Sequence, residues 1–339
     1  MIGLATLRTT AAVAFGLLIS ATAHAQLFRS YVASTGNDAN PCTLQAPCRL
    51  LGPALTAVMD GGEIWMLDSG NFNTSTVNVT KSVTILAVPG ALGSVLAING
   101  PALRINTAGV KVALRNLVIM PLPNAGAQGG ITMSAGAGLT VDNCLVANMP
   151  GNGIAVNADA TVRITDTTIR GNGGVGVLLQ NGARATITRA MIRGNGPQGI
   201  FAYVTRAGTY TIVDIAESTI DTNSAGLLGF IDLGLNAEVS MSIRDSRIVQ
   251  NTSNGLAANG GGGGGSVTLS ASNNIISNND GHGIVVYNTG GRVLATGNTI
   301  SYNDIGLFNT TGVLESAGNN AVRNNNTNKS GPITVVAME

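Results

Sequence analysis

The sequence predicts an all-β solenoid, in which one short unit of strands and turns is stacked repeatedly along an axis. Three observations support this prediction. Related segments recur at intervals of 22–28 residues. Apolar and polar residues alternate with period two inside each unit, as they do in β-strands. The interval also varies, which excludes a coiled coil with its fixed heptad and suits a solenoid whose loops differ in length.

The composition excludes several other classes of protein. The 339 residues include 46 Gly and 10 Pro, 44% are hydrophobic, 10% are charged, and the formal net charge is +1. A disordered chain has more charge and less hydrophobicity, and a collagen-like chain has a strict Gly-X-Y period with much more Pro. Nucleic acid is not expected as a partner, because phosphate binding needs a clustered basic surface.

Residues 1–25 have the features of a signal peptide. Arg8 supplies a positive charge, residues 11–19 form an apolar run, and Ala23-His24-Ala25 provides a small-x-small cleavage site. A membrane anchor is the alternative, but the run is short for a span of about 20 apolar residues. We therefore expect a secreted or periplasmic protein with no transmembrane anchor after cleavage near Ala25.

Residues 26–62 form a lead-in that contains two of the three cysteines. Cys42 and Cys48 are separated by five residues in a turn-rich stretch, and export permits a disulfide between them. Such a short loop contributes about 2 kcal/mol. Cys144 has no expected partner and is interpreted as a packed thiol. No metal site is expected, because two cysteines and one distant histidine match no ligand spacing.

Residues 63–330 contain the repeat, and residues 331–339 form a C-terminal tail. Each unit has one apolar core position, and these positions are Ile119, Leu145, Ile169, Ile192, Ile220, Ile248, Ile276, Ile300 and Val322. Asparagine follows three residues later, at Asn148, Asn172, Asn195, Asn223, Asn251, Asn279, Asn303 and Asn325. A glycine and a hydrophobic residue then begin a further strand, as at Gly176-Val177 and Gly199-Ile200. Each unit therefore has three short strands.

The asparagine column has two possible interpretations. The amides could form a row that binds sugars. Alternatively they could be structural, because asparagine tolerates left-handed backbone angles, hydrogen-bonds its own turn, and can form ladders between stacked strands. A column that continues through so many successive units favours the structural interpretation.

The repeat resembles the right-handed parallel β-helix, or pectin-lyase-like, superfamily, which includes pectate lyases, polygalacturonases, phage tailspikes and secreted bacterial proteins of unassigned role. Residues 31–40, Pro47 and the apolar residues Leu50, Leu51, Ala54, Leu55 and Val58 are similar to the lead-in of extracellular members. The resemblance implies a right-handed parallel β-helix with a short N-terminal helix that caps the open end. Such a cap also protects exposed strand edges.

In the resembled family, the strand after the Gly-hydrophobic step carries the substrate cleft. Period two predicts which of its residues point outward. The first outward row is Ala155, Leu178, Phe201, Leu228, Ala257, Val285 and Phe308, and the second is Asn157, Gln180, Tyr203, Phe230, Asn259, Tyr287 and Thr310. An exposed apolar surface of this kind usually marks a binding site. The predicted ligand-binding residues are Phe201, Tyr203, Phe230, Tyr287, Gln180 and Asn259.

Neither outward row contains a charge, which weighs against a catalytic face. Glycoside hydrolysis needs two carboxylates, and the only polygalacturonase-like feature is His282 in Gly281-His282-Gly283. Lyase chemistry needs a strong base and a positive charge or Ca²⁺. For that chemistry the loops after the face offer Arg184, Arg206 and Arg292, with Asp159 and Asp232 nearby. Of these residues, His282, Arg206 and Asp232 are the catalytic candidates to examine.

The sequence thus predicts an exported, non-catalytic β-helix protein that binds an extended glycan or another envelope component through this outward face. A polysaccharide lyase or glycoside hydrolase, with its site in the adjacent loops, is the alternative. The second alternative is a structural or self-associating surface protein, which would form a homo-oligomer. The apolar face could also be covered by the protein's own loops. No cofactor is expected, and Ca²⁺ would be needed only for the lyase alternative.

Overall fold

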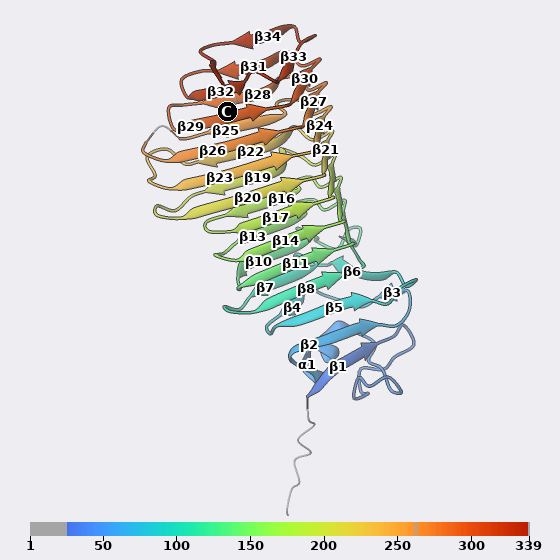
Figure 1. Ribbon diagram of the computed structural model, residues 1–339. Helices are drawn as coiled ribbons and strands as arrows, with labels where there is room; N and C mark the ends of the chain where they lie inside the picture. Colours follow the sequence, from blue (N-terminus) through green and yellow to red (C-terminus); the bar gives the residue numbers. More distant parts are fainter. Residues whose placement is uncertain (1–25, 262, 338–339) are drawn as a thin grey trace, which may run out of the picture.

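The computed structural model describes residues 26–261 and 263–337, so the expected signal peptide lies outside the described residues. The chain winds into a stack of coils, each contributing one strand to each of three parallel sheets (Figure 1). This arrangement confirms the predicted all-β solenoid and the three short strands of each unit. Parallel pairing follows from the winding, because successive strands of one sheet all run in the same direction.

Sheets A, B and C are named here in the order in which a coil enters them. Sheet A contains β1 Leu27–Val32, β2 Val58–Met66, β5 Val83–Ala87, β8 Lys111–Arg115, β11 Gly138–Asp142, β14 Thr161–Thr165, β17 Arg184–Thr188, β20 Tyr210–Ala216, β23 Glu238–Arg244, β26 Ser266–Ser272, β29 Gly291–Thr296, β32 Val313–Ala317 and β35 Thr334–Val336. Sheet B contains β3 Gly70–Asn71, β6 Gly93–Ala97, β9 Leu117–Pro121, β12 Leu145–Ala147, β15 Thr168–Arg170, β18 Met191–Arg193, β21 Thr219–Asp221, β24 Arg247–Val249, β27 Ile275–Ser277, β30 Thr299–Ser301 and β33 Ala321–Val322. Sheet C contains β4 Val77–Val79, β7 Leu103–Asn106, β10 Ile131–Ala135, β13 Ile154–Asn157, β16 Val177–Gln180, β19 Gln198–Val204, β22 Ala225–Ile231, β25 Leu256–Asn259, β28 His282–Tyr287, β31 Ile305–Asn309 and β34 Thr327–Ser330.

The strands extend into both segments that flank the predicted repeat. β1, in the lead-in, pairs with β2. β35, beyond residue 330, pairs with β32. The helix α1 Leu51–Ala57 packs against β1, β2 and β4 with Leu51, Ala54 and Leu55 buried, so it caps the N-terminal end of the coil as predicted (Figure 1). Within the described residues, no helix has the length and apolar character needed to span a membrane.

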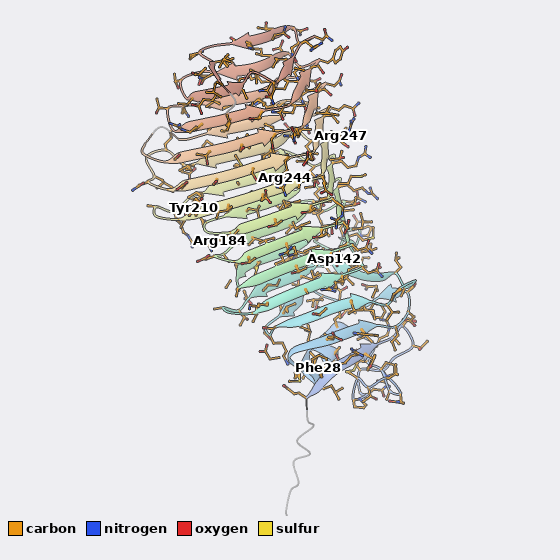
Figure 2. The ribbon with its side chains drawn as sticks, in the orientation of Figure 1. Phe28, Asp142, Arg184, Tyr210, Arg244 and Arg247 are labelled. Carbon is orange, nitrogen blue, oxygen red and sulfur yellow. A yellow bond between two sulfur atoms is a disulfide. The ribbon has the colours of Figure 1, made fainter. Side chains whose placement is uncertain are left out.

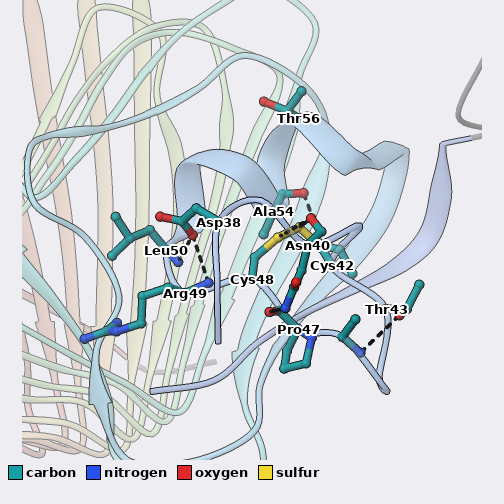
Figure 3. The surroundings of a disulfide bond; sticks show 12 residues. Asp38, Asn40, Cys42, Thr43, Pro47, Cys48, Arg49, Leu50, Ala54 and Thr56 are labelled. Atoms are coloured by element: carbon teal, nitrogen blue, oxygen red, sulfur yellow. Dashed lines mark hydrogen bonds between the residues drawn. A yellow bond between two sulfur atoms is a disulfide. The ribbon is translucent and has the colours of Figure 1, made fainter. Parts of the chain in front are cut away.

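The lead-in is held by the predicted disulfide between Cys42 and Cys48 (Figure 3). Their Cα atoms are 4.6 Å apart, within the normal range for a disulfide. Nearby, one carboxylate oxygen of Asp38 accepts hydrogen bonds from the backbone N–H groups of Arg49 and Leu50, each at 2.8 Å (Figure 3). These contacts tie the lead-in to the start of the capping helix.

The core column of sheet B confirms the predicted repeat with one correction. Ile169, Ile192 and Ile220 face one another in adjacent coils and are fully buried. In the coil before them, however, Val146 pairs with Ile169, and Leu145 is only partly buried on the outer side. The sequence offered two adjacent apolar residues here, and the prediction chose the wrong one.

The asparagine column is a buried hydrogen-bond ladder, which confirms the structural interpretation from Asn172 onward. Asn172 donates through Nδ2 to Oδ1 of Asn195 at 2.8 Å, and Asn195 donates in the same way to Asn223 at 3.0 Å. Asn148 was wrongly included. It has a left-handed backbone with φ 59° and is exposed, while the backbone N–H of Met149 donates to Asn172 at the start of the ladder.

A second buried ladder runs along the turns that lead from sheet A to sheet B. Its members accept hydrogen bonds from the preceding coil, and they are Cys144, Thr167, Ser218, Ser246, Asn274, Asn298 and Asn320. The predicted packed thiol is therefore explained, since Cys144 occupies a ladder position that other coils fill with a hydroxyl or an amide. Burial raises the pKa of its thiol to about 12.

Candidate functional site

The two predicted outward rows lie in register on sheet C. In the first row, Leu178 pairs with Phe201, and Phe201 pairs with Leu228. In the second row, Gln180 pairs with Tyr203, and Tyr203 pairs with Phe230. Because strands alternate their side chains between two faces, these residues share the outer face of the sheet while their neighbours fill the core.

Phe201, Tyr203 and Phe230 form a cluster of rings that we call the aromatic platform. The rings of Phe201 and Tyr203 are stacked, with centroids 4.9 Å apart and planes inclined by 6°. The ring of Phe230 lies 5.7 Å from that of Tyr203 and is tilted by 49°. All three side chains are partly exposed. Mutual packing therefore orders the rings and leaves part of each accessible to solvent.

A hydrogen bond fixes the end of the platform. The hydroxyl of Tyr203 donates to a carboxylate oxygen of Asp232 at 2.7 Å. This bond raises the pKa of Tyr203 above its ordinary value, and burial raises it further by a smaller amount. The phenol therefore remains protonated at neutral pH. Asp232, one of the catalytic candidates, is thus engaged in orienting an aromatic ring.

Beyond the platform, two residues of the first outward row on sheet C are buried. Tyr287 turns back along the sheet, because its hydroxyl accepts a hydrogen bond from Nδ2 of Asn254 at 3.3 Å, and Asn254 lies before the start of β25. Ala257 is 2% exposed and Val285 is fully buried. The predicted outward row is therefore not exposed as far as Phe308, since Ala257 and Val285 in its middle are buried.

The two predicted amides differ in their availability. Oδ1 of Asn259 accepts from Nδ2 of Asn288 at 2.6 Å and from the backbone N–H of Gly261 at 3.3 Å, so the following loop uses this oxygen. Gln180 makes no side-chain hydrogen bond within the part of the chain that the structure describes, and it lies next to Tyr203. Gln180 is the amide that a ligand on the platform could reach.

His282 lies at the first position of β28, where its ring meets that of Phe308 edge to face with centroids 4.6 Å apart. Its backbone N–H donates to Oδ1 of Asn254 at 3.1 Å. Burial lowers the pKa of the imidazole, although the charge of Asp304 opposes this. The ring is therefore neutral at pH 7. Its Nδ1 is buried and has no hydrogen-bond partner among the described residues.

The fold separates His282 from the other catalytic candidates. Register through β25 places His282 level with Ala225 of β22, seven residues before Asp232. At about 3.3 Å per residue, the two side chains begin about 23 Å apart along the strand direction. Arg206 is exposed in the loop after β19, at the same end of the strands as Asp232, which follows β22. These three residues do not form one site.

Two further arginines were predicted to lie in loops, and the structure corrects this. Arg184 begins β17 and Arg292 lies in β29, both on sheet A (Figure 2 labels Arg184). Arg184 forms an ion pair with Asp159. The loops are shorter than the sequence pattern suggested, because the strands of sheet A start earlier. Among residues 26–261 and 263–337, no group of three or more His, Cys, Asp or Glu side chains is arranged to hold a metal ion.

Comparisons with known proteins agree with this architecture. Residues 102–270 match the family model described as right handed beta helix region. No curated protein matches the chain by sequence. Solved structures with a similar fold include the pectate lyase Pel9A, at TM-score 0.56 and 14% identity over 93% of this chain and 79% of that one. The Dettilon tailspike protein has TM-score 0.57 and 14% identity over 90% and 68% of the two chains.

A third similar structure is the A-module of the mannuronan C-5 epimerase AlgE6 from Azotobacter vinelandii. Its TM-score is 0.55 at 14% identity, covering 82% of this chain and 91% of that module. Identities this low establish the fold and leave the activity open. Together with the three-sheet winding and the two ladders, these matches show that the chain is a right-handed parallel β-helix with a pectin-lyase-like fold.

Proposed function

We propose that the protein is an exported glycan-binding β-helix that holds an extended polysaccharide on the aromatic platform of sheet C. The observation that supports this most is the pre-ordered arrangement of Phe201, Tyr203 and Phe230 on an outward face. Aromatic rings present apolar faces that suit the C–H faces of sugars, and Gln180 and Asp232 supply polar groups at the platform's edge.

The ordering of the platform favours ligand binding energetically. Stacking of Phe201 on Tyr203 and the hydrogen bond to Asp232 restrict the side chains before a ligand arrives. Side chains that are already ordered lose less conformational entropy when they bind. Burying one aromatic side chain completely contributes roughly 1.5 to 3 kcal/mol, and because these rings are already partly buried, each could account for up to about a 10-fold change in affinity.

A binding role is also more consistent with the charges than catalysis is. Hydrolysis needs two carboxyl groups about 5 to 9.5 Å apart across the sugar bond. The platform has Asp232 at one end, where it already accepts a hydrogen bond from the hydroxyl of Tyr203, and His282 lies about 23 Å away along the strand direction. The similar structures include a pectate lyase, and polysaccharide is the class of ligand that we carry over from it.

The test combines glycan-array binding, a cleavage assay on the same glycans and light scattering. Wild type is compared with the variant Phe201→Ser/Tyr203→Ser/Phe230→Ser. The matched control is Phe28→Ser/Tyr302→Ser, which removes two exposed aromatic side chains that lie outside the coils of the platform. We expect wild type and control to bind a glycan without cleaving it, and the triple variant to lose binding with its thermal midpoint nearly unchanged.

Three outcomes would contradict the proposal. Glycan cleavage by the wild type would show an enzyme, and loss of cleavage in His282→Ala would then identify the site. A fall in molecular mass confined to the triple variant, without any glycan binding, would show that the platform joins two copies of the chain. Equal binding by wild type and the triple variant would remove the platform from the site.

A further inference from the structure

A second candidate site lies on sheet A, away from the platform. A surface hollow of about 550 Å³ spans strands β5, β8, β11 and β14. Two cations line it, Lys111 of β8 and Arg163 of β14, together with the hydroxyl-bearing residues Ser82, Thr84, Thr140 and Thr161. The same hollow contains Ala113 and Gly138 where longer side chains would reduce its depth.

The glycine in this hollow is not required by the backbone. Gly138 is an outward residue of β11, paired with Lys111 on one side and Thr161 on the other. Its φ is not positive, and a Cβ added to it would make only ordinary contacts, the nearest at 3.5 Å to Cγ of Lys111. Glycine weakens a strand relative to residues with side chains, and in a strand it often marks a place where a ligand approaches closely. The fold itself gives no reason for this glycine.

The two cations lack partners among the described residues, as do Arg115 and Arg292 of the same sheet, whereas three other arginines of the sheet form ion pairs. Arg29, Arg184 and Arg244 form ion pairs with Glu63, Asp159 and Asp214, respectively. Neither the amine of Lys111 nor the guanidinium of Arg163 makes a side-chain hydrogen bond or ion pair with any residue that the structure describes. Figure 2 labels two of the paired arginines, Arg184 and Arg244.

The spacing of the cations limits the kind of ligand. Lys111 and Arg163 are two coils apart along the axis and two residues apart in register. With about 4.8 Å between strands and about 3.3 Å per residue, their Cα atoms are roughly 12 Å apart. At this separation the long side chains of Lys and Arg can meet over one small anion or extend to two separate anionic groups. A chain that carries several anionic groups, and offers hydroxyls to the threonines between the cations, uses the second arrangement and the rest of the hollow.

We propose that this hollow binds an acidic oligosaccharide, with Lys111 and Arg163 each contacting one anionic group and the chain lying over Gly138. The threonine hydroxyls between the cations and the shallow floor of small residues favour a sugar as the ligand. The site is independent of the platform on sheet C, so either proposal can fail without the other.

The test is calorimetric titration of the full chain with an oligogalacturonate hexamer at low salt, and with a neutral glucan hexamer of the same length. Three variants are compared: Lys111→Gln/Arg163→Gln, the control Arg292→Gln/Lys329→Gln with the same change in net charge, and Gly138→Leu with no change in charge. Arg292 and Lys329 are exposed cations in other coils. Thermal midpoints establish that each variant is folded.

We expect the acidic hexamer to bind the wild type and the control within twofold of each other. The Lys111/Arg163 variant should bind at least tenfold more weakly, and Gly138→Leu should lose most of the affinity by filling the hollow. The neutral hexamer should not bind in the hollow, so Gly138→Leu should leave any binding of it unchanged. Equal weakening in the control would show diffuse electrostatic attraction, and unchanged binding in Gly138→Leu would place the ligand elsewhere. Either of these two results would overturn the proposal. Absence of binding of the acidic hexamer by the wild type would also overturn it, as would equally tight binding of inorganic polyphosphate.

Discussion

The asparagine ladder allows a quantitative prediction for Asn223→Ala. The amide of Asn223 makes four hydrogen bonds. Its Oδ1 accepts from the backbone N–H of Asn195 at 2.9 Å and from Nδ2 of Asn195 at 3.0 Å. Its Nδ2 donates to the carbonyl of Ile192 at 3.1 Å and to Oδ1 of Asn251 at 3.2 Å. Alanine removes all four, and Asn223 is 1% exposed, so water has little access to replace them.

The expected loss follows from which groups keep another partner. Nδ2 of Asn195 still donates to the carbonyl of Ile169, and Oδ1 of Asn251 still accepts from the backbone N–H of residue 223. The backbone N–H of Asn195 loses its only partner, whereas the carbonyl of Ile192 lies in β18 and still takes part in the ladder with β21. A buried polar group without a partner costs about 1 to 3 kcal/mol. We therefore expect the free energy of unfolding to fall by about 1 to 3 kcal/mol.

Urea unfolding followed by far-UV circular dichroism measures this loss, and the slope of the free energy against urea checks that the whole coil still unfolds together. Asn328→Ala is the matched control. Asn328 accepts from the N–H and Nδ2 of Asn325 at the exposed end of the same ladder, so water can replace it and the loss should stay within about 0.5 kcal/mol. Equal losses in the two variants would refute the view that the buried ladder stabilises the coil.

Three further predictions concern the cysteines and His282. Because burial raises the pKa of Cys144 to about 12, iodoacetamide at pH 8 should not alkylate it in the folded protein and should alkylate it fully in urea; rapid labelling of the folded protein would contradict the assignment. Replacing Cys42 and Cys48 with serine should lower the free energy of unfolding by about 2 kcal/mol, and a urea titration that shows no loss would contradict this. Burial depresses the pKa of His282 from its ordinary 6.5, so the unfolded chain binds the proton more readily and the stabilising contribution, complete above pH 6.5, is lost as the pH falls through the folded-state pKa. His282→Gln should remove this part of the acid dependence, and identical unfolding profiles of wild type and variant between pH 5 and 7 would disprove it.

The fold could be predicted from the sequence because each coil repeats the same chemistry. Ile192, Ile220 and Ile248 occupy one column, and the same is true of the asparagines that follow them. The prediction failed where one residue type suits two positions. Asn148 follows two adjacent apolar residues, Leu145 and Val146, and asparagine is favoured both in the ladder and in the left-handed turn that it occupies.

The second ladder could not be read in the same way because its members differ in type. Thr167, Ser218 and Asn274 all accept a hydrogen bond from the preceding coil, but no single residue marks the column. The sequence did place the platform, since period two determines which residues point outward. It did not predict that Tyr287 would turn back toward Asn254 or that Val285 would be buried, because a side-chain rotamer depends on contacts between coils.

The constant interval between some coils makes the length of the molecule adjustable. Asn195, Asn223, Asn251 and Asn279 follow one another at separations of 28 residues. Removing residues 252–279 would bring Asn251 directly before Asp280 and let it donate to Asn303, in the position that Asn279 now occupies. The solenoid would become shorter by one strand spacing, about 4.8 Å, and β28 would pair with β22 of the platform in place of β25, while the hollow on sheet A stays in coils away from the deletion. Evolution or design can therefore change the reach of this protein by whole coils, and can bring a different strand beside the platform by the same step.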